Sequence, residues 1–295
     1  MSQIRNKIMS NLHKYMILPA AVLFAAFFLL PLIQGIGVSL TDWNGFSEEK
    51  NFVGLSNFIR FFHDDRAINA IKVTMIFGLI SPFLLNIFGL MLALLFDSKI
   101  KGRILARTVV YLPTIISPLI MGYLWTLILS PQTGVLDKTL RALNMGYLYR
   151  DYLGNMDKAL WLIIAVNLWQ FVGGPMMIYL AGLQNVPEEL YESAKIDGAN
   201  AVQTFTYLTW PLLLPSAKVN ILTNIIGSMA VFDIIMSLTM GGPGYATESL
   251  SIYIYRMSFN GFAGYATAVA IIMFIMVVIP IGFVMRWSNR KEVEM

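Results

Sequence analysis

The sequence predicts an all-α integral membrane protein with six membrane-spanning helices. Hydrophobic residues make up 57% of the 295 residues and charged residues only 13%, against about 45–50% and about 25% in soluble domains. The charged residues occur in clusters, and the stretches between clusters are long enough for the roughly 20 apolar residues that cross a hydrocarbon core of about 30 Å. These stretches are continuously apolar and do not alternate with polar residues, which argues against the strands of a membrane barrel.

The predicted spans divide a single domain, residues 1–295, into membrane and loop segments. Proline lies within several spans, and because it removes a helix hydrogen bond it predicts kinks there. The first span is much longer than the apolar region of a signal peptide and no small-x-small cleavage site ends it, so we expect an uncleaved helix. The six spans are expected near residues 16–40, 72–96, 108–130, 159–184, 213–239 and 262–286.

The position of the basic residues predicts the orientation. The short loop at 97–103, DSKIKGR, lies between the second and third spans and is strongly basic. Because cytoplasmic loops carry an excess of Lys and Arg, we assign this loop and both termini to the cytoplasmic side of a bacterial inner membrane.

The composition also limits the chemistry. The chain has no cysteine and only two histidines, His13 and His63, which lie outside the long apolar runs. Disulfides and thiolate metal sites are excluded, and a His-based metal site or catalytic triad is not expected. An integral-membrane enzyme would need clustered catalytic groups near an interface, and neither histidine has an obvious catalytic partner.

Residues 185–211, between the fourth and fifth spans, predict a cytoplasmic helix-turn-helix. Asn185 is a suitable N-cap, and Gly198 can adopt the left-handed conformation that ends a helix. A second short helix is expected over about 200–208, ending before Pro211. Such a segment suits docking into a groove of another protein, and an ordinary solvated connector is the alternative.

Polar residues within the apolar spans are candidates for a substrate pathway, because they are costly in a membrane. Those of the fifth span fall within an arc of about 100° on a regular helix. Amides and hydroxyls of this kind bind neutral sugars through hydrogen bonds, although packing between helices would use similar residues. The candidates are Asn220, Thr223, Asn224, Gly227 and Ser228 on the fifth span, and Asn167 and Gln170 on the fourth.

Asp233 is a separate candidate on the fifth span. It follows Asn224 by nine residues, which places it about 180° away on a regular helix. Either it lies hydrated near the outer interface, or it is a buried carboxylate that takes part in coupling.

The loop at 185–211 resembles the EAA motif of permease subunits in ATP-binding-cassette importers. Glu192-Ser193-Ala194 is followed after three residues by Gly198, and nine more residues lead to the stretch 208–211. Ser193, Leu208 and Trp210 depart from the usual residues but keep their size class or apolarity. Stretches at 31–43, 52–58, 107–125 and 238–259 also resemble the maltose/lactose/glycerol-3-phosphate type of these permeases.

The resemblance implies a subunit that forms half of a carbohydrate pathway (oligosaccharide, disaccharide or polyol) and pairs with a second permease. An extracytoplasmic sugar-binding protein would deliver the substrate. Two cytoplasmic ATPase subunits would bind ATP and Mg²⁺, since this sequence contains no G-x-x-x-x-G-K-[ST] phosphate cradle. A glycerol phosphate substrate, or a transporter or channel not coupled to ATP, remains an alternative. The implied ATPase-coupling residues are Glu192, Ser193, Ala194, Asp197, Gly198 and Ala199, and Gly241, Gly242 and Pro243 form a rigid external turn.

Overall fold

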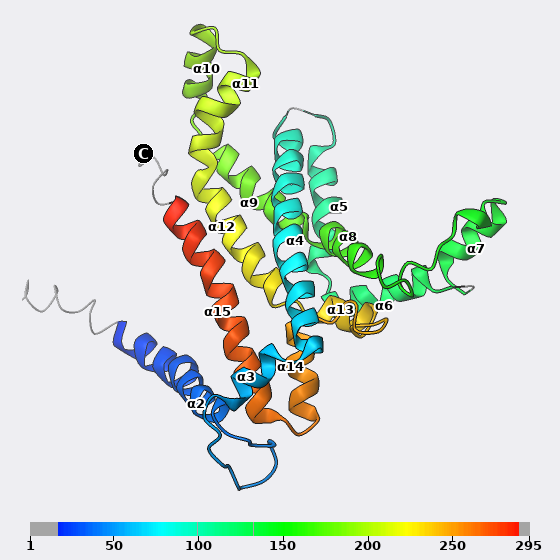
Figure 1. The fold of residues 1–295 in the computed structure, drawn as a ribbon. Coiled ribbons are helices and arrows are strands. Elements are labelled where there is room, and N and C mark those ends of the chain that lie inside the picture. The colour runs from blue at the N-terminus through cyan, green and yellow to red at the C-terminus, as the bar shows by residue number, and fades with distance from the viewer. Residues whose placement is uncertain (1–16, 99, 132, 289–295) are drawn as a thin grey trace, which may run out of the picture. The chain divides into compact units, whose positions relative to one another are not determined.

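The computed structural model describes residues 17–98, 100–131 and 133–288, and the regular secondary structure in these ranges is helical, apart from one isolated β-bridge between Thr41 and Phe52. Figure 1 shows the course of the chain. The all-α fold class is therefore confirmed. The chain divides into two compact units, the first made of residues up to His63 together with Ile254–Ile272, and the second of Asp64–Tyr253 together with the residues from Met273 onward.

The first unit contains the helix Ile17–Ser39 and an ordered loop after it. The side chain of Asn57 closes this loop by donating hydrogen bonds to the carbonyls of Ser39 and Thr41, each 2.8 Å long. Asn51 donates to the carboxylate of Asp42 through its backbone and its side chain. These bonds stabilise the charged carboxylate and hold the pKa of Asp42 below its usual value.

Apart from the helix Ile17–Ser39, the helices that lie wholly in the first unit are short. Two further helices, α14 and α15, have residues in both units. The bounds are η1 Ala25–Leu29, α2 Leu30–Ser39 and α3 Ser56–Phe62, followed later in the chain by α14 Leu250–Phe259 and α15 Ala263–Ser288.

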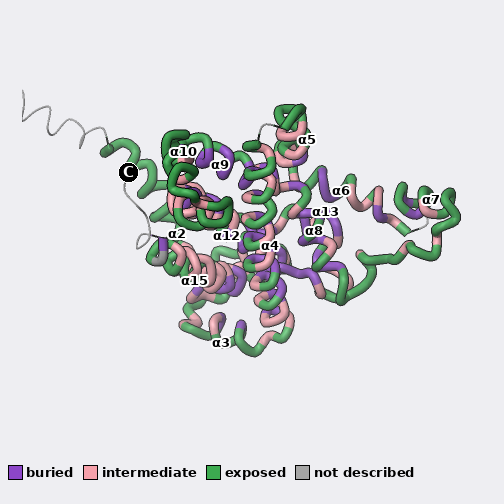
Figure 2. Tube along the Cα trace, turned by 90° about the horizontal axis from the view of Figure 1, so that it is seen from above, coloured by how far each residue is buried: buried purple, intermediate pink, exposed green. Residues whose placement is uncertain are grey.

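The second unit is built around α4, a helix of 33 residues that packs against α8, α9 and α12. Figure 2 shows buried residues gathered on these helices and exposed residues on α7 and α10. The remaining bounds are α4 Asp65–Asp97, α5 Arg103–Ile115, α6 Pro118–Leu129, α7 Val135–Ala142, η2 Gly146–Leu148, α8 Ala159–Phe171, α9 Gly173–Gln184, α10 Glu188–Ile196, α11 Ala201–Thr204, η3 Phe205–Thr209, α12 Trp210–Met229 and α13 Asp233–Leu238.

Three predicted spans are continuous helices in the structure: Ile17–Ser39, Asp65–Asp97 and Ala263–Arg286. All three are long and apolar enough to cross a membrane. The proline in the middle of α4, Pro82, does not interrupt its helix, and neither does Pro280 in α15.

The predicted third span, 108–130, is not one straight helix. It consists of α5 and α6, which meet at an angle of 99°. Ser117 has ψ 132°, as expected for a residue before proline, because the Pro118 ring disfavours the helical conformation there. In Figure 1, α6 accordingly turns away from the direction of α5 and leads toward α7.

The fourth and fifth predicted spans are also interrupted. α8 and α9 form a bent pair with an angle of 43°. α8 ends at Phe171, four residues before Pro175, whose ring crowds the carbonyl of Phe171. The stretch 213–239 is not one helix, since α12 ends at Met229 and α13 begins at Asp233. The buried hydroxyl of Ser249 donates to the carbonyl of Val231 within this break, at 2.8 Å.

Candidate functional site

A cavity of about 290 Å³ lies in the second unit among α4, α5, α8, α9 and α12. Its wall combines amide, hydroxyl and apolar side chains with two glycines. Such a mixture suits a small polar ligand, because convergent polar groups orient the ligand while apolar groups contact its carbon skeleton. The lining residues are Leu85, Thr114, Asn167, Phe171, Gly174, Pro175, Ile178, Asn220, Thr223, Asn224, Gly227 and Ser228.

Most of the pathway residues predicted from the sequence meet at this cavity. The polar face of α12 points toward α8 and α9, so residues from the fourth and fifth predicted spans share one wall. Six predicted residues line it: Asn167, Asn220, Thr223, Asn224, Gly227 and Ser228.

The amides on the wall are only partly hydrogen-bonded within the protein. Asn167 donates to the hydroxyl of Ser81 at 2.7 Å, and Asn220 donates to the carbonyl of Pro175 at 3.2 Å. The Oδ1 atom of Asn220 and the Nδ2 atom of Asn224 are buried without a partner. Both residues line the cavity, but these two atoms themselves have almost no accessible surface in this conformation. The amides can both donate and accept hydrogen bonds.

Gln170 and Asp233, the two other pathway candidates, are not among the residues that line this cavity. Gln170 is completely buried, and its Nε2 donates to the carbonyl of Ile116 at the break between α5 and α6, at 2.9 Å. Asp233 is exposed in the first turn of α13. The regular-helix argument that placed it opposite Asn224 does not apply, because α12 ends between the two residues.

Thr114 and Phe171 are cavity residues that sequence reasoning missed. Thr114 lies on α5 beside a helix break, and Phe171 ends α8 beside another. Neither residue belongs to a periodic polar pattern in the sequence. Each faces the cavity because its helix bends nearby, and that bend depends on the tertiary structure.

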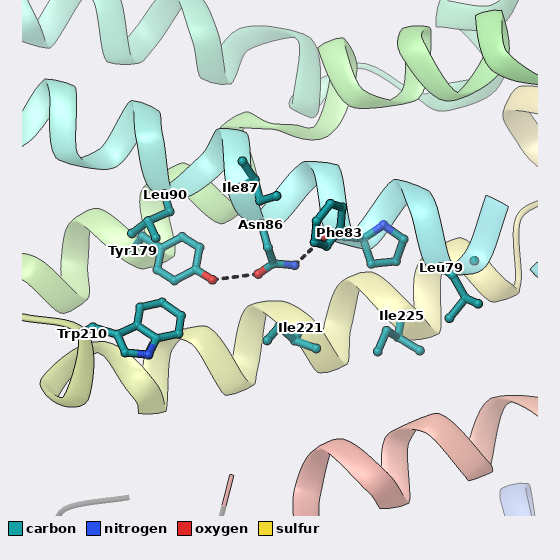
Figure 3. A pocket seen from close by; sticks show the side chains of 11 residues that line it. Leu79, Phe83, Asn86, Ile87, Leu90, Tyr179, Trp210, Ile221 and Ile225 are labelled. Carbon is teal, nitrogen blue, oxygen red and sulfur yellow. Dashed lines mark hydrogen bonds between the residues drawn. The ribbon is translucent and has the colours of Figure 1, made fainter. Parts of the chain in front are cut away.

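A second cavity, of about 360 Å³, lies between α4, α9 and α12 and is mostly apolar. Figure 3 shows two of its polar side chains bonded to protein: Tyr179 donates to Oδ1 of Asn86 at 2.8 Å, and Nδ2 of Asn86 donates to the carbonyl of Pro82. Unlike the first cavity, it has no unpaired amide atom on its wall. A sugar would therefore find fewer partners here.

The segment with the EAA resemblance forms two short helices, but not with the predicted limits. α10 begins after Pro187 instead of at an Asn185 cap, since Asn185 ends α9. The second helix does not end before Pro211. It runs through η3 into α12, and the π-helical turn η3 directly precedes Trp210 and Pro211, which is the kind of local adjustment that accommodates a proline in a helix.

The turn between these helices is held by backbone hydrogen bonds. Gly198 has φ +76°, its N–H donates to the carbonyl of Lys195, and the N–H of Ala199 donates to the carbonyl of Ala194. This pair of bonds is the Schellman ending of a helix, which favours glycine at the left-handed position. Asn200 and Gln203 then form a capping box at the start of α11.

The implied coupling residues are accessible on this turn. Glu192, Ser193, Asp197 and Gly198 are exposed, while Ala194 and Ala199 are half-buried. Two apolar side chains beside them are also open to solvent, Ile196 at 86% and Val202 at 74%. In Figure 1 this turn lies at the end of α12 remote from α13.

The loop with Gly241, Gly242 and Pro243 is tied to the start of α4 by a buried ion pair. Gly241 has φ +80°, and the Gly242–Pro243 peptide is cis. Arg66 donates to both carboxylate oxygens of Glu248, at 2.6 and 2.7 Å. The side chain of Glu248 has 0% exposure, and the guanidinium also lies 3.9 Å from the ring centre of Tyr245.

Comparisons with known proteins agree with this architecture. The family model described as binding-protein-dependent transport system inner membrane component matches residues 52–293. The probable starch degradation products transport system permease protein AmyD of Thermoanaerobacterium thermosulfurigenes is 34% identical over 268 residues, covering 90% of each chain. The sn-glycerol-3-phosphate transport system permease protein UgpA of Agrobacterium fabrum is 31% identical over 288 residues, covering 97% of this chain and 96% of that protein.

A solved structure is similar over nearly the whole chain. It is a bacterial alginate ABC transporter in complex with an alginate pentasaccharide-bound periplasmic protein. The matched chain has 28% sequence identity and a TM-score of 0.79, with 97% of this chain and 96% of that chain covered. The protein therefore belongs to the family of binding-protein-dependent transport system inner membrane components, as an ABC transporter permease and not an enzyme.

Proposed function

We propose that this chain forms half of the translocation pathway of an ATP-driven carbohydrate importer. The observation that carries the proposal is the cavity whose wall carries the amides of Asn167, Asn220 and Asn224, which can donate and accept hydrogen bonds. Sugar hydroxyls supply both kinds of hydrogen bond at once. The starch-product permease and the alginate transporter among the similar proteins support a carbohydrate substrate.

The chemistry of the cavity favours a neutral sugar over a glycerol phosphate. No lysine or arginine is among the residues that line the cavity. A phosphate group is usually bound by cationic side chains or a helix N-terminus. Because the chain is similar to UgpA, glycerol 3-phosphate is the alternative substrate. Its uptake should be measured in the same assay as that of the sugars.

The membrane topology proposed here has six crossings, with the termini and the α10–α11 turn on the cytoplasmic side. Three crossings are the continuous helices, and the other three are the interrupted pairs α5–α6, α8–α9 and α12–α13. Interrupted helices are tolerated within a membrane where they line a cavity or are covered by protein. All three interrupted pairs lie in the second unit, which holds the cavity.

The α10–α11 turn is the proposed docking point for the ATPase subunits, which would hold ATP and Mg²⁺. Its exposed surface combines acidic side chains, including Glu192, with the apolar Ile196 and Val202. An interface needs such an apolar centre with a polar rim. A second permease would complete the pathway, and an extracytoplasmic binding protein would deliver the sugar.

Removing the two amides should weaken sugar transport without preventing assembly. The double variant Asn220→Ala/Asn224→Ala loses two hydrogen bonds of about 1 kcal/mol each, which corresponds to a roughly 30-fold loss in uptake efficiency. The measurement is uptake of labelled oligosaccharides and of glycerol 3-phosphate by the reconstituted complex. Val219→Ala is the control, because Val219 is exposed on the same helix but outside the cavity lining. Unchanged uptake in the double variant would contradict the assignment.

A matched pair of substitutions at Gly198 tests the docking turn. Valine is strained at φ +76°, whereas asparagine tolerates the left-handed conformation, and neither meets another atom within 4 Å at its Cβ. We expect Gly198→Val to recover at least fivefold less ATPase subunit in co-purification, and Gly198→Asn to recover a nearly normal amount.

A second comparison uses Glu192→Ala combined with Gly198→Val. If this double variant binds as much ATPase subunit as the unaltered chain, the turn is not the docking site. Sugar uptake that continues without any ATPase subunit would instead favour a secondary transporter or a channel.

A further inference from the structure

Two interrupted helix pairs meet at their break points beside the cavity. The α5–α6 pair bends by 99° at residues 116–117, and the α8–α9 pair bends by 43° at Val172. Gln170 lies two residues before the second break, with 0% of its surface exposed. The bends are therefore in direct contact through a buried amide.

Reciprocal hydrogen bonds connect the two breaks. The Nε2 atom of Gln170 donates to the carbonyl of Ile116 at 2.9 Å, and the hydroxyl of Thr114 donates to the backbone carbonyl of Gln170 at 2.8 Å. Each bond crosses from one broken pair to the other. A change in either bend must lengthen or reorient at least one of them.

The backbones also approach closely at this point. A Cβ atom added at Gly173 would lie 2.7 Å from the Cα of Tyr111 and 2.8 Å from the carbonyl oxygen of Val110. The Gln170 and Thr114 bonds therefore act between closely packed backbones. Packed elements of this kind move as a unit.

The amide of Gln170 is not fully used in this conformation. Its Oε1 atom is buried without a partner. A buried unpaired acceptor lowers stability, so a leucine of similar size would lose one hydrogen bond but also remove this penalty. The Gln170 side chain therefore contributes less to stability than its burial suggests. Its main contribution is the hydrogen bond that connects the two helix breaks.

We propose that Gln170 is a positioning residue that fixes the two bends relative to each other and thereby sets the width of the cavity. Thr114 lies on one side of this contact, and Phe171 and Gly174 lie on the other, and all three line the cavity. Opening and closing of the pathway then requires the α5–α6 and α8–α9 pairs to move together. This inference rests on the proposed function for its consequence in transport, but not for the structural coupling.

The structural coupling can be measured without transport. Because the chain has no cysteine, spin labels can be attached through Leu127→Cys on α6 and Met177→Cys on α9, both of which are exposed. We expect a narrow distance distribution in the unaltered background and at least a doubling of its width in Gln170→Leu. Thr114→Val should broaden it as well, since it removes the reciprocal bond with little change in shape. It also serves as the independent variant if Gln170→Leu does not fold.

Transport kinetics of the same variants separate positioning from direct substrate contact. With Gln170→Leu we expect kcat for uptake to fall at least fivefold, and the ATP hydrolysed per sugar to rise, with KM changed less than twofold. Asn224→Leu, a cavity substitution, should raise KM and leave the label distances unchanged. Unchanged distance distributions in both Gln170→Leu and Thr114→Val would overturn the proposal, as would a rise in KM alone. A broadened distribution in a complex that imports no sugar would keep the coupling and reject the proposed function.

Discussion

Arg66→Met is expected to destabilise the protein strongly. It leaves the carboxylate of Glu248 completely buried without its bidentate partner. Breaking a buried ion pair from one side costs about 3–5 kcal/mol, because the remaining charge has lost its hydration and its partner. The midpoint of chemical unfolding of the purified chain in detergent measures this loss.

The reverse substitution should be milder. Glu248→Met leaves Arg66, whose side chain keeps 26% exposure and also contacts the ring of Tyr245. Its charge retains part of its hydration, so we expect the smaller cost, at the lower end of that range. The double variant should recover part of the loss. Glu192→Ala on the exposed face of α10 is the control and should not change stability. Equal effects of the two single variants would contradict this account.

The ion pair also illustrates what the sequence could not predict. Arg66 and Glu248 are 182 residues apart, and neither stands in a pattern that marks it as one of a pair. Each looks like an ordinary charged residue at the edge of an apolar stretch. Their pairing depends on how the loop after α13 returns to the start of α4, which is a property of the tertiary fold.

The polar face of α12 could be predicted because it is local. Asn220, Asn224 and Ser228 recur at helical spacing within one uninterrupted helix, and the structure places them together on the cavity wall. Gln170 also carries a side-chain amide within an apolar span, yet it donates to the carbonyl of Ile116. The periodicity of a sequence predicts which face of a helix a residue lies on. For Gln170, however, the helix break two residues later determines which group its side chain contacts.

The positions of the prolines alone did not predict where the membrane helices are interrupted. Pro118 begins α6 at the 99° bend, whereas Pro82 lies inside the continuous helix α4. The missing N–H is the same in both cases. In α4, the carbonyl that loses its helical partner is that of Gly78, and α9 and α12 pack along the helix. Neighbouring elements thus determine whether a proline interrupts a membrane helix.

Gly89→Ala is expected to separate the two most closely packed helices of the second unit, α4 and α9. A Cβ at position 89 would lie 2.6 Å from the Cβ of Pro175 and 3.1 Å from the backbone nitrogen of Met176. Neither atom can move away by a simple side-chain rotation, since one belongs to a proline ring and the other to the backbone. Such overpacking costs about 1–3 kcal/mol, and small residues are what permit close helix approach in membranes.

The effect of Gly89→Ala should reach the cavity, because Pro175 lines it and its carbonyl accepts the hydrogen bond from Asn220. We therefore expect both a lower unfolding midpoint and at least a tenfold loss of sugar uptake. Gly282→Ala is the matched control: it also replaces a helical glycine, but no atom lies within 4 Å of the added Cβ. It should be neutral or stabilising by up to about 1 kcal/mol through helix propensity. If Gly89→Ala behaves like Gly282→Ala in both measurements, α4 and α9 can separate without distorting the pathway, and the close packing at Pro175 does not define the cavity.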